Sequence, residues 1–227
     1  MKDRFRFSLW RTRGFNGAVP GNTAMSRKSV FRLWRTRLDE AITYGTKKEA
    51  LSLARQALAE ARTSGNAAET EYFKGQVDLI RARPASAIGH FDAAIRLNPK
   101  DGASFNDRAL CMVEIGYIDD AIAYFDRGIA AEPDYATIYH NKGWLLNNIG
   151  CHTEAIRCFR KALALEPGRA VTYDNLADAL YNLGDLAGAL EAYKKVLLNL
   201  APGRCLSIRK QICRQIKDLE KKLRTAP

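Results

Sequence analysis

The residue types that support metal binding or redox chemistry are few and scattered in this sequence. Its three histidines are His90, His140 and His152, and none stands at a metal-ligand spacing from two cysteines. The cysteines are odd in number and form no Cys-x-x-Cys pair; they are Cys111, Cys151, Cys158, Cys205 and Cys213. We therefore expect reduced, packed thiols, no metal site and no cofactor.

Motifs for catalysis are also missing. The sequence has no phosphate-binding Gly-x4-Gly-Lys-Ser/Thr, no Gly-x-Gly-x-x-Gly before a helix, no His-Glu-x-x-His and no Gly-x-Ser-x-Gly. The adjacent acids Asp119 and Asp120 are expected in a turn, where they cap the next helix. The protein is therefore not expected to be an enzyme.

A pattern of small, aromatic and proline residues recurs every 34 residues. An alanine is followed four places later by an aromatic residue and eight places beyond that by proline. The sets are Ala87, Phe91 and Pro99; Ala121, Phe125 and Pro133; Ala155, Phe159 and Pro167; and Ala189 and Tyr193, with Pro202 one place late. Apolar residues before each set follow helical spacing, and Gly184 ends one such helix, so each period predicts two helices that meet at the alanine.

This period and its Ala-x3-Phe…Pro spacing resemble the tetratricopeptide repeat family. The resemblance implies an all-α fold, a right-handed α-solenoid of stacked antiparallel helix pairs with a C-terminal capping helix. The expected units are a degenerate one at 31–64, then 68–101, 102–135, 136–169 and 170–203. Unit 68–101 lacks the glycine of the hairpin and has Pro84 in its turn.

The two ends of the chain are basic, whereas its body is mildly acidic. Residues 1–37 carry a net charge of +9, residues 204–227 carry +6, and residues 38–203 carry −4. Residues 1–30 have no repeat register and are expected to be disordered, although 7–13 closely copies 31–37. Residues 204–227 are expected to form the amphipathic capping helix, whose basic face is either solvated or a site for a charged partner.

In the family, the first helix of each unit lines a concave groove, which implies a set of peptide-contacting residues here. They are Asn106, His140, Asn141, Trp144, Asn148, Asp174, Asn175, Asp178 and Tyr181. Asn141 and Asn175 share one repeat position and resemble the asparagine ladder of peptide-binding members; alternatively, they bond the neighbouring helix. Trp144 is either the centre of the groove or core packing. Groove positions of units 102–203 hold no Lys or Arg, so the family's carboxylate-clamp function is rejected.

Two functions follow from these features. The first is a protein-binding scaffold that holds an extended peptide or a partner helix in the groove, with a preference for basic ligands. The alternative is a nucleic-acid or anionic-membrane tether that acts through the basic ends, although the acidic body argues against nucleic acid. No apolar run is long enough to span a bilayer. A cytoplasmic location is expected, and the Arg-rich N-terminus leaves organellar targeting open. Alternatively, translation starts at Met25, just before the first unit, and not at Met1.

Overall fold

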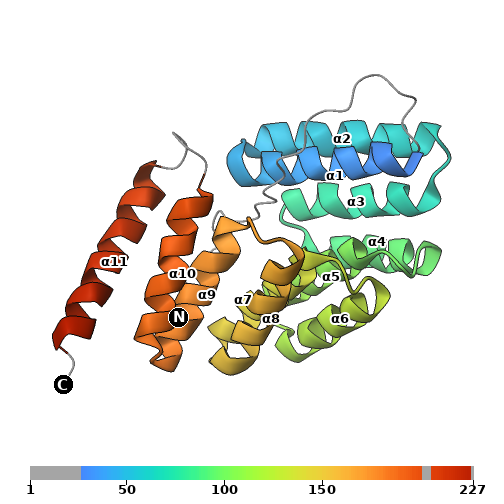
Figure 1. The fold of residues 1–227 in the computed structure, drawn as a ribbon. Coiled ribbons are helices and arrows are strands. Elements are labelled where there is room, and N and C mark those ends of the chain that lie inside the picture. Colours follow the sequence, from blue (N-terminus) through green and yellow to red (C-terminus); the bar gives the residue numbers. More distant parts are fainter. Residues whose placement is uncertain (1–26, 201–205, 226–227) are drawn as a thin grey trace. The chain divides into compact units, whose positions relative to one another are not determined.

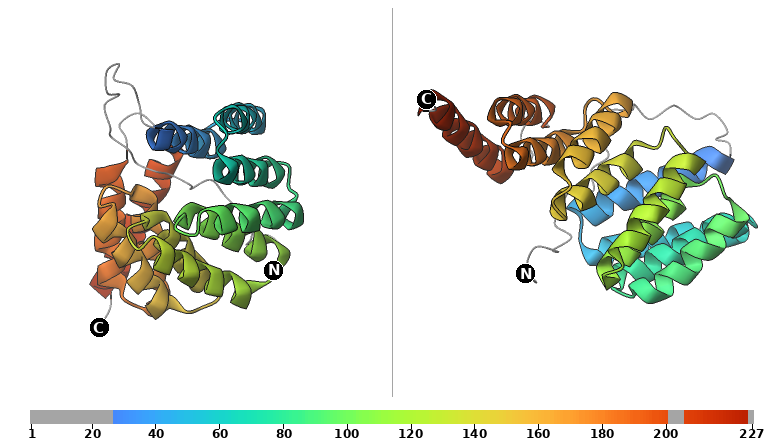
Figure 2. Two further views of the ribbon diagram at one scale, coloured as in Figure 1. Left: turned by 90° about the vertical axis from the view of Figure 1, so that its right-hand side faces the viewer. Right: turned by 90° about the horizontal axis from the view of Figure 1, so that it is seen from below.

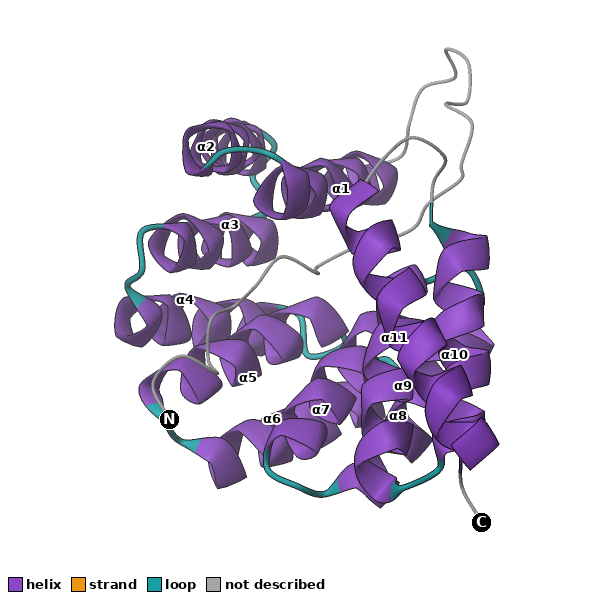
Figure 3. Cartoon of the chain, turned by 90° about the vertical axis from the view of Figure 1, so that its left-hand side faces the viewer, coloured by secondary structure: helices purple, strands orange, loops and turns teal. Residues whose placement is uncertain are grey.

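The computed structural model describes residues 27–200 and 206–225, which form eleven α-helices and no strand. Figure 1 shows the helices in chain order, and Figure 3 shows short loops between consecutive helices from α1 to α10. The expected all-α repeat fold is confirmed. The expected disorder of residues 1–30 falls almost entirely outside the described residues, but the first helix begins at Arg27, inside that range.

The chain divides into two compact units, 1–133 and 134–227, which are described separately. The first unit contains the first six helices: α1 (Arg27–Tyr44), α2 (Lys47–Thr63), α3 (Ala67–Ile80), α4 (Pro84–Leu97), α5 (Gly102–Ile115) and α6 (Ile118–Ala131). Each packs on the next along the chain. Figure 2 shows the antiparallel pair α3 and α4 from two further directions.

The second unit contains five described helices: α7 (Ala136–Asn148), α8 (His152–Leu165), α9 (Ala170–Leu183), α10 (Leu186–Asn199) and α11 (Leu206–Thr225). Here too each helix packs on the next, and α7 also contacts α9 directly. The last helix, α11, lies on α10 through Ile212 and Leu219, which are buried.

The recurring alanine and aromatic residues form the core of the helix pairs. Each of the four alanines of the repeat has 0% of its surface exposed, and so do Phe91, Phe125 and Phe159. A small residue on the partner helix makes room for the ring. A Cβ atom added to Gly75 would lie 2.7 Å from the Phe91 ring, and one added to Gly143 would lie 2.9 Å from Phe159. The packing of the aromatic ring against a small residue therefore fixes the distance between the two helices of each pair.

The helix ends explain where the pairs turn. The α5 and α9 helices end at Gly116 and Gly184, whose φ angles of 90° and 89° lie in the left-handed region that glycine adopts cheaply. Pro84 is the first residue of α4, a position where its missing N–H costs no hydrogen bond. One expectation is corrected: Asp119 and Asp120 lie in the first turn of α6, and Tyr117 is the N-cap.

Candidate binding surfaces

The nine expected groove residues are divided between the two units. Asn106 lies on α5 in the first unit. The other eight lie on α7 and α9 in the second unit: His140, Asn141, Trp144 and Asn148 on α7, and Asp174, Asn175, Asp178 and Tyr181 on α9. Because α7 and α9 contact each other, these eight residues are carried by neighbouring helices.

Three of the nine side chains are buried. The exposed fraction is 2% for Asn106, 4% for His140 and 7% for Asn141. Asn106 donates its amide to the Asp107 carboxylate at 3.0 Å. Side chains this deep position their neighbours and are not open to a ligand.

His140 is held between α8 and α9. Its Nδ1 lies 3.0 Å from the Thr172 hydroxyl, and its ring packs 5.9 Å from that of Phe159. Burial, together with the positive charge of Arg169, holds the pKa of His140 well below its usual value, so the ring is neutral. The Asn175 amide lies 3.4 Å from His140 Nε2, which is the kind of contact between neighbouring helices that competes with a peptide ladder.

A pair of carboxylates, Asp174 and Asp178, stands one turn apart on α9, and both are partly buried. Burial and the nearby Asp178 charge raise the pKa of Asp174 to about 7. Burial also raises the pKa of Asp178, although the Tyr193 hydroxyl donates a hydrogen bond to this carboxylate and opposes the rise. Among the described residues, neither aspartate forms an ion pair, so no cation offsets the cost of desolvating the two carboxylates.

The remaining candidates are open to solvent to different degrees. Trp144 is partly buried, and Asn148, one turn later, donates its amide to the Trp144 backbone oxygen at 2.9 Å. Tyr181 is 40% exposed, and the Lys222 ammonium of α11 lies 4.8 Å from the centre of its ring. These aromatic faces and amides can supply contact area and hydrogen bonds to a ligand.

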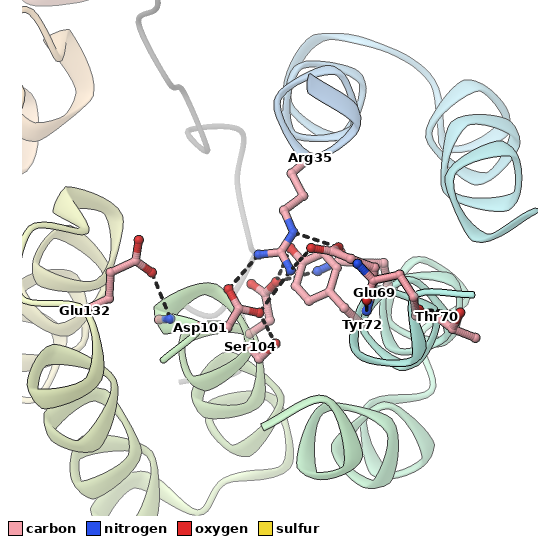
Figure 4. Close-up of polar contacts among 11 residues, drawn as sticks. Arg35, Glu69, Thr70, Tyr72, Asp101, Ser104 and Glu132 are labelled. Carbon is pink, nitrogen blue, oxygen red and sulfur yellow. Dashed lines mark hydrogen bonds and ion pairs between the residues drawn. The ribbon is translucent and has the colours of Figure 1, made fainter. Parts of the chain in front are cut away.

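The first unit contains a polar network that the repeat pattern did not predict. Figure 4 shows Arg35 of α1 reaching between the carboxylates of Glu69 on α3 and Asp101 at the N-cap of α5. Its guanidinium donates to Asp101 at 2.7 and 3.0 Å and to Glu69 at 3.0 and 3.2 Å. The same guanidinium lies 3.8 Å from the centre of the Tyr72 ring.

Arg35 therefore pairs with two carboxylates, the buried Asp101 and the partly buried Glu69, and it affects their pKa values differently. Burial would raise the pKa of Asp101, but Arg35 outweighs that effect and Ser104 adds a hydrogen bond, so this pKa is lowered. The pKa of Glu69 is raised, because burial outweighs the lowering effect of Arg35. The negative charge of Asp101 raises this pKa further. The network is internally paired and joins α1 to α3 and to the start of α5, so its role is structural.

A sequence signal for this network existed, because Arg35 and Glu69 stand 34 residues apart, which is one repeat period. Tyr72 and Asp107 extend the network along the unit. The Tyr72 hydroxyl donates to Asp107 at 3.0 Å, and Gln76 donates to the same carboxylate.

Within the described ranges, no group of three or more His, Cys, Asp or Glu side chains is placed to hold a metal ion. The four cysteines described there are free thiols. None of the helices described is both long and apolar enough to cross a bilayer.

The chain belongs to the tetratricopeptide repeat family. Two family models described as tetratricopeptide repeat match it, one at residues 74–136 and the other at 134–198, and together they span more than half of the chain. No curated protein sequence matches the chain.

Solved structures share this fold at low sequence identity. The thermophilic TPR protein TTC0263 of Thermus thermophilus is 21% identical with a TM-score of 0.66, and the match covers 84% of this chain and 99% of that one. YrrB, described as a TPR protein with an unusual peptide-binding site, is 19% identical with a TM-score of 0.53, covering 82% and 93%. The first TPR domain of Spaghetti (RPAP3), bound to the HSP90 peptide SRMEEVD, is 17% identical with a TM-score of 0.50, covering 56% and 95%.

Proposed function

We propose that the protein is a non-catalytic binding scaffold and that α7 and α9 of its second unit hold a peptide segment bearing Lys or Arg. Tetratricopeptide repeats typically mediate protein–protein interaction, which supports a protein partner. Two structures of the same fold, YrrB and the Spaghetti domain, are described with a peptide-binding site or a bound peptide. Those descriptions support a peptide as the class of ligand.

The observation that carries the proposal is the carboxylate pair Asp174 and Asp178. Both groups are partly removed from water without a cation to offset the cost. A Lys or Arg side chain placed between them would favour their ionised forms and gain strength from the low local dielectric. A ligand of this kind is therefore selected by charge.

The neighbouring side chains add contact area and backbone recognition. Trp144 and Tyr181 offer aromatic surface. Asn148 and Asn175 each bond a neighbour through one N–H, and the second N–H and the oxygen of each amide can bond a peptide backbone. The buried His140 links α7 to α9 through its contacts with Thr172 and Asn175.

A selection from a random-peptide library against the full chain tests the proposal. Enriched peptides should carry Lys or Arg, and the same peptides with each Lys and Arg replaced by Glu serve as negative controls. Trp144→Ala and the double substitution Asp174→Asn/Asp178→Asn should each weaken binding about tenfold or more. The matched control is Tyr117→Ala, an exposed aromatic in the first unit, which should leave the affinity unchanged.

Circular dichroism melts of each variant separate loss of binding from loss of folding. Enrichment of acidic peptides would contradict the proposal. So would undiminished binding by the folded Asp174→Asn/Asp178→Asn variant, because the ligand would then lie elsewhere.

A further inference from the structure

The outward face of α11 carries a straight row of cations. Spacings of four and three residues place side chains on one line along a helix, opposite the face that packs on α10. The row consists of Lys210, Arg214, Lys217, Lys221 and Arg224, all of them exposed. Ile212 and Leu219, on the opposite side of the helix, are only 1% and 3% exposed. Packing therefore fixes the row so that it points away from the protein.

This row has no counter-charge within the part of the chain that is described. None of its five members forms an ion pair there. The two acids of the helix, Asp218 and Glu220, stand to either side of the row by their helical positions. At 1.5 Å per residue the row is about 20 Å long, which is enough to meet several anionic groups at once.

An exposed leucine beside the row favours a membrane surface over a nucleic acid as the anionic partner. Leu206 lies on the same line as the cations, at the start of α11, and is 64% exposed. A leucine adds nothing to contact with a phosphate backbone, and the row lacks the aromatic and amide side chains that bind bases. The headgroup region of a bilayer, in contrast, accepts cations and an apolar side chain together.

We propose that the outer face of α11 docks the protein on a membrane surface rich in anionic lipid. This surface is separate from the α7 and α9 site and does not depend on the peptide-binding proposal. Because the apolar face of α11 is already covered by α10, binding rests mainly on charge and should be weak, reversible and sensitive to salt.

Co-sedimentation of the full chain with vesicles tests this surface. The vesicles are phosphatidylcholine alone or with about 30% phosphatidylserine. The chain should pellet only with the anionic vesicles, and raising the salt from about 0.1 to 0.5 M should release it. Lys210→Glu/Lys217→Glu should reduce partitioning about tenfold or more, and Leu206→Asp should reduce it by a smaller factor.

The matched control is Arg160→Glu/Lys195→Glu, which makes the same charge change at exposed positions of α8 and α10. It should keep most of the binding. The proposal is overturned if anionic vesicles do not bind the chain, or if the control loses as much binding as the α11 variant. It is also overturned if the α11 substitutions abolish binding to a DNA duplex but leave binding to the vesicles unchanged.

Discussion

At the scale of single residues, one alanine occupies a position that glycine fills elsewhere in the repeat. Gly116, Gly150 and Gly184 follow their helices with φ between 87° and 90°, and Ala82, one period before Gly116, has φ 59°. The hydrogen bonds around Ala82 follow the same pattern as those around Gly184, with the next residue donating to the helix at 2.9 Å in both turns. The turn therefore holds the backbone of Ala82 in a strained left-handed conformation.

We expect Ala82→Gly to stabilise the protein by about 0.5–1 kcal/mol, because relief of left-handed strain exceeds the added freedom of the unfolded chain. Gly116→Ala is the matched reverse change and should cost about 1 kcal/mol. Urea unfolding of both variants measures this. A destabilised Ala82→Gly protein would show that the turn is not strained.

The raised pKa of Asp174 makes a second prediction, about pH. The folded chain keeps the Asp174 proton up to a pH of about 7, whereas the unfolded chain loses it near the ordinary value of 3.8. The folded state thus binds more protons between these values, and the contribution of Asp174 to stability falls as the pH rises through them. His140 acts in the opposite sense, since its lowered pKa costs stability as the pH falls below about 6.5.

Asp174 and His140 change the stability in opposite directions as the pH rises. The contribution of Asp174 is therefore measured by comparing a variant with the wild-type protein at two pH values. Asp174→Asn should stabilise the protein by about 1–2 kcal/mol more at pH 8 than at pH 5, relative to wild type. Urea unfolding at both pH values measures the difference, with the exposed Asp218→Asn as control. An effect of Asp174→Asn that is the same at both pH values would rule out the raised pKa.

The repeat pattern predicts residues whose role depends on their own helix pair, such as Phe159 in the core and the turn glycines. It does not predict contacts that depend on how one pair is offset against the next. The link between Arg35 and Asp101 joins residues 66 positions apart, and no local spacing encodes it. Burial of Asn106 and His140, which were expected to face a ligand, likewise depends on neighbouring elements.

At the scale of elements, Arg35 joins the degenerate first helix to the regular repeats. The α1 helix supplies the guanidinium, α3 supplies Glu69 and Tyr72, and the N-cap of α5 supplies Asp101. Phe31 packs beside this contact, with its ring 6.3 Å from that of Phe73. A terminal helix with few family residues is thus held by a specific ion network as well as by apolar packing.

Arg35→Ala should cost about 3–5 kcal/mol, because it leaves the buried Asp101 and the partly buried Glu69 without their cation. The triple variant Arg35→Met/Glu69→Gln/Asp101→Asn removes the charges together and should recover part of that loss. Urea unfolding of the two proteins tests this. A cost below about 0.5 kcal/mol for Arg35→Ala would show that α1 does not depend on the network.

At the scale of the whole molecule, the two proposed surfaces carry charges of opposite sign. We propose that the carboxylates of α9 select a cationic peptide and that the outer row of α11 selects an anionic surface. Opposite charges let one chain engage two partners without competition between them. The mildly acidic body and basic ends noted in the sequence are consistent with this division of roles.

The central claim is that Asp174 and Asp178 hold a cation of the bound peptide, and calorimetric titration of a selected Lys-containing peptide at pH 6 and pH 8 tests it most directly. Bound Lys favours ionised carboxylates, so the peptide should bind up to about tenfold more tightly at pH 8 and should release protons near pH 7. In Asp174→Asn this dependence should largely disappear. Equal affinity at both pH values in the wild-type protein, without proton release, would contradict the claim.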